Sequence, residues 1–198
     1  MTKVDLSDAI DSINKGNLVV YPTDTLYALG ADIFNKDAAK KVFILKNRPF
    51  SNPIPVAVAN IDEMSRIAYI DKSIKSIVDK FLPGALTIIL RKKNIVPNIV
   101  TAGLDNIAIR IPNNKIALKL LLECGPLTVT SANLHDKKTP DIINDIMMLF
   151  STNISSYIDG GILNGKPSTI VDLTNRKPKI IRQGDINIGQ ILDAIYNG

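Results

Sequence analysis

Three arginines occupy positions where an anion could be bound. The 198-residue chain has 24 basic residues, of which only six are arginines. Arg48 follows Lys46 near the end of a helical pattern, while Arg110 and Arg182 lie within or end apolar strand patterns. A guanidinium can grip a carboxylate or a phosphate with two parallel N–H groups, which lysine cannot do. Anion binding is therefore one interpretation, and a solvated cation or an internal salt bridge is the ordinary alternative.

Small hydroxyl and amide residues close another strand pattern, T-V-T-S-A-N at residues 128–133. Ser131 and Asn133 suit hydrogen bonding to a ligand in a crevice at a strand end. A serine nucleophile would need a base within reach, and no G-x-S-x-G turn surrounds Ser131. His135 follows closely, but this spacing alone does not imply contact. The segment therefore favours binding over nucleophilic attack.

Residues 160–166 match a phosphate-binding loop pattern, but the residues that follow do not fit such a loop. The segment G-G-I-L-N-G-K satisfies G-x-x-x-x-G-K, yet Pro167 stands where a serine or threonine would hold magnesium. A strand pattern follows in place of the helix that would cradle phosphate. The segment is predicted to be a glycine-rich turn between two strands.

The amino-acid composition excludes several kinds of site and several classes of protein. The chain is 45% hydrophobic and 22% charged, which is typical of a globular protein. Cys124 is the one cysteine and His135 the one histidine, which excludes an intrachain disulfide and a His/Cys zinc cluster. The N-terminus has no signal-peptide pattern, and no uncharged apolar run reaches the roughly 18 residues of a membrane span. A cytoplasmic protein without membrane contact is expected, and its net charge of +5 favours anionic partners such as nucleotides or RNA.

Alternating helix and strand patterns must position these residues. Helices are predicted over residues 6–15, 37–46, 61–68, 72–81, 115–124, 142–150 and 188–196. Strands are predicted over residues 17–22, 54–59, 86–90, 107–111, 127–131, 157–159, 169–173 and 179–182, with a polar loop at 23–30. This order predicts a single α/β domain over residues 1–198, with one twisted, mostly mixed sheet and flanking helices.

Seven segments, in order along nearly the whole chain, resemble the motifs of the YrdC-like family. They are Y-P-T-D-T-L-Y-A-L-G at 21–30, K-x-R with the following N-P at 46–53, P-G-A-L-T at 83–87, T-A-G-L-D through R-I-P at 101–112, S-A-N at 131–133, S-T-I at 168–170 and R-Q-G at 182–184. Any one of them is weak, whereas seven in register are specific. The resemblance implies an α/β fold with a concave, positively charged face.

The resemblance also implies an activity, that of a nucleotidyltransferase. Such an enzyme condenses L-threonine, bicarbonate and ATP to threonylcarbamoyl-AMP and pyrophosphate. A separate transferase complex then moves the threonylcarbamoyl group to the tRNA adenosine next to the anticodon. Magnesium would be held mainly by the phosphates, without a metal site on the protein.

Carried over motif by motif, the resemblance assigns a role to each site residue. Lys46 and Arg48 are the candidates for catalysis by holding the phosphates. The residues implied to bind threonine are Thr25, Arg110 and Ser168, and those implied to surround ATP are Lys46, Arg48, Asn52, Asn106, Ser131, Asn133 and Arg182.

The chain departs from the family pattern at several places. Ala28 replaces a frequent glycine, which predicts a tighter loop, and Ala57 replaces a histidine that many members place near threonine. Leu134, His135 and Asp136 follow the S-x-N motif where members usually have a glycine-containing turn. No second domain follows, so a short form of the family is expected. Cys124 and His135 are predicted to be dispensable for chemistry.

Two other functions stay open at this point. One is a carbamoyl-transfer module of the hydrogenase-maturation type, which shares the fold but normally belongs to a larger chain with zinc-finger segments. The other is an RNA-binding or ribosome-assembly module, which the basic charge suggests.

Overall fold

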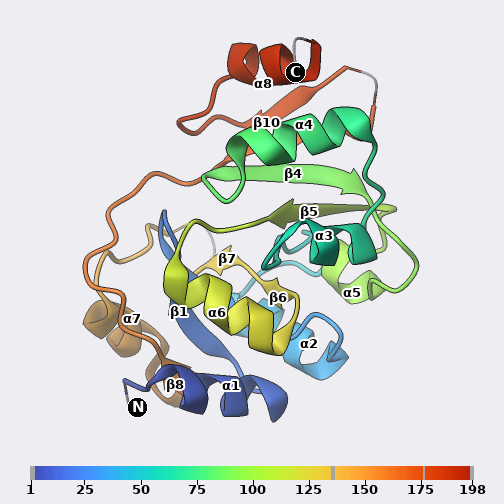
Figure 1. Cartoon of the computed structure of the whole chain (residues 1–198). Helices are drawn as coiled ribbons and strands as arrows, with labels where there is room; N and C mark the ends of the chain where they lie inside the picture. The colour runs from blue at the N-terminus through green and yellow to red at the C-terminus, as the bar shows by residue number, and fades with distance from the viewer. Residues whose placement is uncertain (1–2, 135–136, 176, 197–198) are drawn as a thin grey trace.

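The fold was obtained as a computed structural model, and the structure describes residues 3–134, 137–175 and 177–196 (Figure 1). The helices are α1 Leu6–Asn14, α2 Lys36–Lys46, α3 Ile61–Ile67, α4 Lys72–Phe81, α5 Asn98–Thr101, α6 Lys115–Cys124, α7 Ile143–Phe150, the 3₁₀ turn η1 Ser151–Asn153 and α8 Ile188–Tyr196. The strands are β1 Val19–Pro22, β2 Tyr27–Gly30, β3 Val56–Ala57, β4 Leu86–Arg91, β5 Asn106–Arg110, β6 Leu127–Thr128, β7 Thr130–Ser131, β8 Ser156–Tyr157, β9 Thr169–Asp172 and β10 Lys179–Arg182.

The strands form two mixed sheets, so the prediction of one sheet is wrong while the α/β class is confirmed. A four-stranded sheet has the order β7-β2-β1-β8, and a six-stranded sheet has the order β10-β9-β4-β5-β3-β6. The run predicted as one strand at 127–131 is divided at Val129, whose N–H donates to Pro55 O at 2.8 Å. β6 therefore pairs with β3 in one sheet, and β7 pairs with β2 in the other.

Only the first part of the polar loop predicted at 23–30 is a loop, because the second part is a strand. Tyr27–Gly30 is a fully buried strand that pairs antiparallel with β1. The Tyr27 hydroxyl donates to Gly161 O at 2.8 Å and accepts from the N–H of Gly160 at 2.9 Å, so this aromatic side chain is anchored from the far end of the chain. A Cβ on Gly30 would approach the Tyr21 ring to 2.8 Å, which explains glycine at the end of β2.

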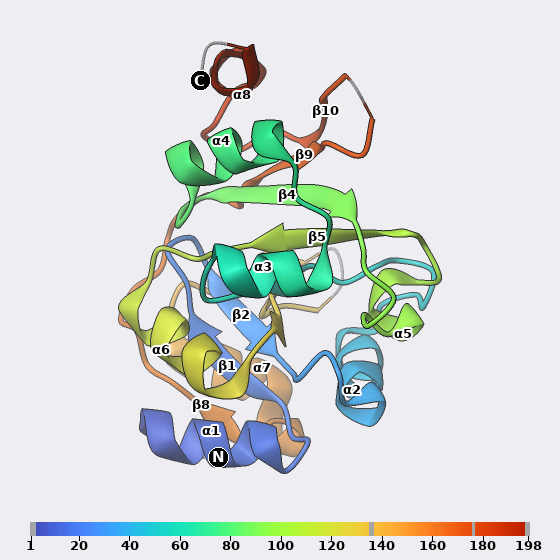
Figure 2. The same cartoon turned by 45° about the vertical axis from the view of Figure 1, so that its right-hand side comes forward.

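Helices cover both faces of the smaller sheet. Val19 and Tyr21 pack with apolar residues of α1 and α6, whereas Val20 packs with those of α2 and α7. This division follows from the alternation of side chains along a strand. Against the larger sheet, α4 and α8 lie side by side (Figure 2). No helix in the described ranges is long and apolar enough to cross a membrane.

The end of α2 sets the direction of the K-x-R motif. Asn35 caps the helix by accepting from the N–H groups of Asp37 and Ala38. Asn47 ends the helix in the left-handed conformation, with φ of 51°, which asparagine tolerates better than most residues. The turn directs Lys46 and Arg48 to different surroundings.

Candidate active site

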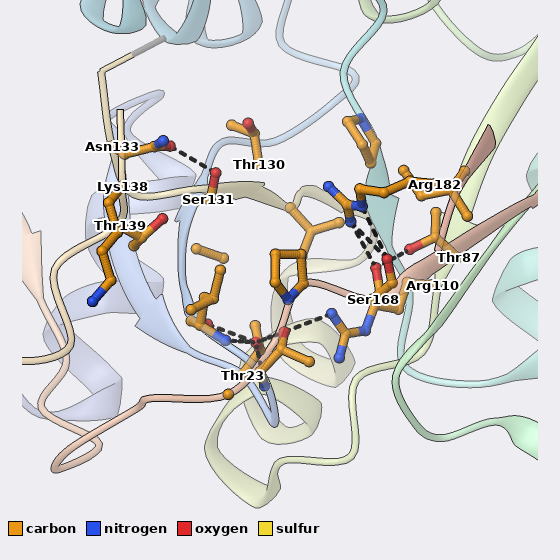
Figure 3. Close-up of a pocket in the computed structure, with 18 of the residues that line it drawn as sticks. Thr23, Thr87, Arg110, Thr130, Ser131, Asn133, Lys138, Thr139, Ser168 and Arg182 are labelled. Carbon is orange, nitrogen blue, oxygen red and sulfur yellow. Dashed lines mark hydrogen bonds between the residues drawn. The ribbon is translucent and has the colours of Figure 1, made fainter. Parts of the chain in front are cut away.

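A cavity of about 570 Å³ takes its wall from both sheets (Figure 3). Pockets of roughly 300–1,000 Å³ commonly hold small ligands, so an amino acid and part of a nucleotide are within its capacity. Seven of the ten predicted site residues line it: Thr25, Arg48, Arg110, Ser131, Asn133, Ser168 and Arg182.

Arg110 lies at the end of β5 with 4% of its surface exposed. Its Nε donates to Gly84 O at 3.0 Å, its Nη1 to Thr25 Oγ1 at 2.8 Å and its Nη2 to Asp24 Oδ1 at 2.7 Å. The same Asp24 oxygen accepts from the N–H of Asn113 at 3.0 Å. Three of the five guanidinium N–H groups thus hold its orientation, and the other two can serve a ligand.

The Thr25 hydroxyl lines the cavity and contacts both Thr23 and Arg110. The Thr23 hydroxyl donates its one proton to Leu26 O at 2.6 Å and accepts from the N–H groups of Thr25 and Leu26, both at 3.2 Å. The 3.1 Å contact between the two threonine hydroxyls therefore does not fix the direction of the Thr25 proton. Thr25 Oγ1 accepts from Arg110. The Thr25 hydroxyl can therefore form a hydrogen bond with a polar group of a ligand in either direction.

Arg182 and Ser168 form a second polar cluster beside Arg110. Arg182 Nε and Nη2 donate to Ser168 O at 3.0 and 2.9 Å, and Nη2 also lies 3.2 Å from Ser168 Oγ. A bulge in β10 between Ile180 and Arg182 alters the register at this point and directs the guanidinium. Burial, and secondarily the charge of Arg110, lowers the pKa of Arg182.

The structure does not place the Lys46 ammonium in the cavity wall, contrary to the expectation that it holds phosphate directly. Lys46 Nζ donates to Ser131 O at 2.6 Å, to Asn133 O at 2.5 Å and to Asn133 Oδ1 at 2.8 Å, with 2% of the residue exposed. The last turn of α2 turns this side chain inward, where three acceptors satisfy it. Burial, and then the charge of Arg48, lowers its pKa to about 7.

The S-x-N motif is braced from within. Asn133 Oδ1 accepts from Ser131 Oγ at 2.6 Å as well as from Lys46, and its Nδ2 donates to Lys137 O. Both ends of the Asn133 amide are thereby occupied by protein groups. Ser131 has given up its proton and can offer lone pairs to a ligand.

Arg48 keeps the position that the motif predicts. Its Nε donates to Asn52 O at 3.1 Å and its Nη2 to Pro53 O at 2.8 Å. Asn52 does not line the cavity. Its backbone oxygen orients the arginine, so its contribution is indirect.

Asn106 lies away from the cavity wall, and its contact with ATP stays a prediction. It begins β5 while Arg110 ends it, which separates the two by about 13 Å at the rise of an extended strand. Asn106 does not line the cavity. Ala57, the position of the missing histidine, is fully buried opposite Arg110 in β3. His135 lies outside the described residues.

The glycine-rich segment forms part of the wall without being a phosphate-binding loop. No helix follows it, and Asn164, Gly165 and Pro167 line the cavity. A Cβ on Gly165 would lie 2.6 Å from Thr25 O, so the absence of a side chain permits this close approach.

The sequence reasoning missed several wall residues. Thr87 belongs to the P-G-A-L-T motif and Thr23 to the first motif, but the motifs alone assign neither residue a role. The others are Leu26, Ala28, Pro55, Val129, Thr130, Lys137, Lys138, Thr139, Asp141, Asn164, Gly165, Pro167 and Ile170. Asp141 is the one carboxylate among the lining residues, and no group of three or more metal-binding side chains occurs in the described ranges.

The protein is thus an α/β protein whose two mixed sheets contribute to one cavity, and the arginines and hydroxyl groups of its wall suit an anionic ligand. The family model described as telomere recombination, for the Sua5, YciO and YrdC proteins, matches residues 11–184. The chain belongs to this family.

Several relatives are similar over most of this chain. A threonylcarbamoyl-AMP synthase of Pyrococcus abyssi is 36% identical over 186 residues, which cover 92% of this chain and 55% of the relative. A putative threonylcarbamoyl-AMP synthase of Methanocaldococcus jannaschii is 39% identical, covering 90% of this chain and 85% of the relative. This chain thus spans about half the length of the Pyrococcus protein and most of the Methanocaldococcus one.

Solved structures agree with the fold. The crystal structure of P. abyssi Sua5 complexed with L-threonine superposes with a TM-score of 0.92 at 33% identity, covering 98% of this chain and 59% of that one. The crystal structure of Escherichia coli YciO gives 0.86 at 28% identity, covering 94% and 92%.

Proposed function

We propose that this protein is a threonylcarbamoyl-AMP synthase. It condenses L-threonine, bicarbonate and ATP, and supplies the threonylcarbamoyl group for tRNA modification through a separate transferase complex in the cytoplasm. The observation that carries the proposal is the arrangement of Arg110 between Thr25 and Ser168, in the same cavity as Arg48 and Arg182. The names of the relatives and the threonine complex of the Pyrococcus protein support it.

Threonine binds at the Arg110 end of the cavity in this proposal. Its carboxylate accepts from the remaining Arg110 N–H groups and from Ser168. Its amine or hydroxyl forms a hydrogen bond with the Thr25 hydroxyl. The site therefore recognises the carboxylate by charge and the other polar groups of the amino acid by hydrogen bonds.

ATP occupies the side of the cavity formed by Arg48, Arg182 and the braced segment 131–133. Arg48 and Arg182 face the phosphates, and Ser131 offers an acceptor. Lys46 contributes through the loop whose carbonyl groups it binds. Magnesium enters with ATP and is held by phosphate oxygens and water, because the described wall supplies only one carboxylate.

The reaction needs positioning and charge stabilisation in place of a covalent intermediate. The unprotonated threonine amine attacks bicarbonate, water leaves, and a carbamate forms. A carbamate oxygen then attacks the α-phosphorus of ATP, and pyrophosphate leaves. Arginines near the phosphates stabilise the negative charge that gathers on their oxygens.

The test is product formation with each substrate omitted in turn. We expect pyrophosphate and threonylcarbamoyl-AMP only when ATP, L-threonine and bicarbonate are all present, measured by mass spectrometry. Arg48→Ala should lose at least about tenfold in rate, because a charge-assisted contact to phosphate is removed. Arg66→Ala on α3 is the matched control. Threonine-independent turnover, or none with all three substrates, contradicts the proposal.

A further inference from the structure

Thr87 is a buried hydroxyl of the cavity wall to which the proposed reaction gives no role. It is the second residue of β4, and 3% of it is exposed. β4 pairs in parallel with β9, which brings Thr87 beside the start of that strand. Its Oγ1 lies 2.8 Å from Ser168 Oγ, and in the described chain this is its one hydrogen bond. Figure 3 shows this contact next to those from Arg182.

The hydrogen bonds of Ser168 can be assigned by counting protons. A hydroxyl has one proton to donate and two lone pairs that accept. Arg182 can only donate, so it occupies one lone pair of Ser168 Oγ, at 3.2 Å. A carboxylate ligand can only accept, so Ser168 must give it the proton. The bond between Ser168 and Thr87 must then come from the Thr87 proton, which occupies the second lone pair.

The geometry points to Thr87 as a positioning residue that makes Ser168 a hydrogen-bond donor. With both lone pairs filled, Ser168 can donate a hydrogen bond to an oxygen of the ligand but cannot accept one from an N–H group. Thr87 thereby contributes to the selection of a carboxylate without touching the reacting atoms. This inference rests on the proposed function, since it takes threonine as the ligand.

The test compares two ligands that differ at the carboxylate. L-threonine and L-threoninamide, in which a neutral carboxamide replaces the carboxylate, are titrated calorimetrically into wild type, Thr87→Val and Thr87→Ser. Valine keeps the shape and the strand preference but removes the hydroxyl, whereas serine keeps the hydroxyl. Thr87→Ala serves as a second variant without the hydroxyl. Affinity for a non-hydrolysable ATP analogue is measured on each protein.

We expect wild type and Thr87→Ser to prefer threonine over threoninamide to a similar degree. In Thr87→Val and Thr87→Ala this preference should fall by about tenfold, the effect of one buried hydrogen bond, because Ser168 can then also accept from the amide. General damage to the site would weaken both ligands equally and leave their ratio unchanged. An unchanged ratio, or the same fall in Thr87→Ser, overturns the role of Thr87. Absence of threonine binding by wild type overturns the proposed function itself.

Discussion

Protein groups already accept hydrogen bonds from Arg110, so its orientation does not depend on a ligand. Asp24, Thr25 and Gly84 each accept one of its N–H groups, and the ion pair with Asp24 is almost fully buried. A buried arginine without such partners would be strongly destabilising. The sequence predicted an anion or an internal salt bridge at this position, and the structure shows that the salt bridge exists and leaves donors for a ligand.

We expect Arg110→Lys to weaken threonine binding by about tenfold or more. A lysine ammonium has three donors and cannot satisfy Asp24, Thr25 and Gly84 while also gripping a carboxylate. Binding of an ATP analogue should be nearly unchanged, because other cations face the phosphates. Calorimetric titration of both ligands checks this, with Arg66→Lys as control. Weakened ATP binding with threonine spared would assign Arg110 to the nucleotide.

Lys46 makes the stability of the protein depend on pH. Burial lowers its pKa from 10.5 to about 7, so between these values the unfolded chain binds a proton that the folded chain does not. The free energy of unfolding contributed by this group therefore rises as pH increases from 7 to 10.5, by up to about 1.4 kcal/mol per pH unit. Urea unfolding of wild type and Lys46→Met across this range should give a difference with that positive slope. A flat difference would show that Lys46 keeps its proton when folded.

Cys124 carries a thiol, which is a reactive group, but we expect it to be inert at its position in the fold. It ends α6 outside the cavity wall, and burial, followed by the charges of Glu123 and Asp32, raises its pKa to about 11. Cys124→Ser should retain turnover within about threefold, far less than the loss of a general acid or base. Alkylation of the wild-type thiol at pH 8 should be slow, because little thiolate exists there. Rapid inactivation by such a reagent would show that the thiol is near the reaction.

At the scale of elements, the end of α2 decides where the two cations of the K-x-R motif point. Lys46 belongs to the last turn of the helix, and Asn47 reverses the chain in the left-handed region. The resemblance implied that both cations hold the phosphates. The structure separates them, because a buried ammonium and a cavity-lining guanidinium require different directions of approach.

Asn47→Val should destabilise the protein by roughly 1–2 kcal/mol, because a β-branched residue is strained in the left-handed region. The shift of the turn should also weaken ATP-analogue binding through Arg48. Asn47→Gly, which adopts this conformation freely, is the matched variant and should keep both properties. Urea unfolding and calorimetry measure the two effects. Equal behaviour of valine and glycine would mean that the turn does not control Arg48.

At the scale of the whole molecule, helices were easier to predict than sheets. Helical spacing and caps such as Asn35 and Asp71 are local, and the predicted helices occur within a residue or two of their bounds. Sheet membership depends on partners distant in sequence. The division at Val129 and the strand Tyr27–Gly30 result from such partners, and no pattern of neighbouring residues marks them.

The same reason limited the prediction of the site. Motif arginines could be found because they are rare and interrupt apolar strands. The bonds from Lys46 to the segment 131–133 join positions more than 80 residues apart, and the contact of Thr87 with Ser168 joins β4 to β9. Both become visible only when the strands are assembled.

The glycine-rich segment connects distant parts of the molecule. It leads from β8 of the smaller sheet to β9 of the larger one and passes the turn at Thr25. Gly165→Ala should push the segment from Thr25 O and weaken threonine binding severalfold, because its Cβ would lie within 2.6 Å of that oxygen. Gly161→Ala is the control for backbone strain alone, since its φ is +80° and no atom lies within 4 Å of its Cβ. Calorimetry with threonine should show the larger loss for Gly165→Ala.

The short connection at Val129 also couples the motions of the two sheets. β6 and β7 are edge strands of different sheets separated by one residue, so neither can leave its sheet without pulling on the other. An opening at this point frees the Ser131 wall of the cavity together with the edge of the larger sheet. In hydrogen exchange the amides of β6 and β7 would therefore become labile in one cooperative event, with a shared opening free energy. Binding that immobilises Ser131 in β7 would therefore slow exchange in β6, at the edge of the larger sheet, as well.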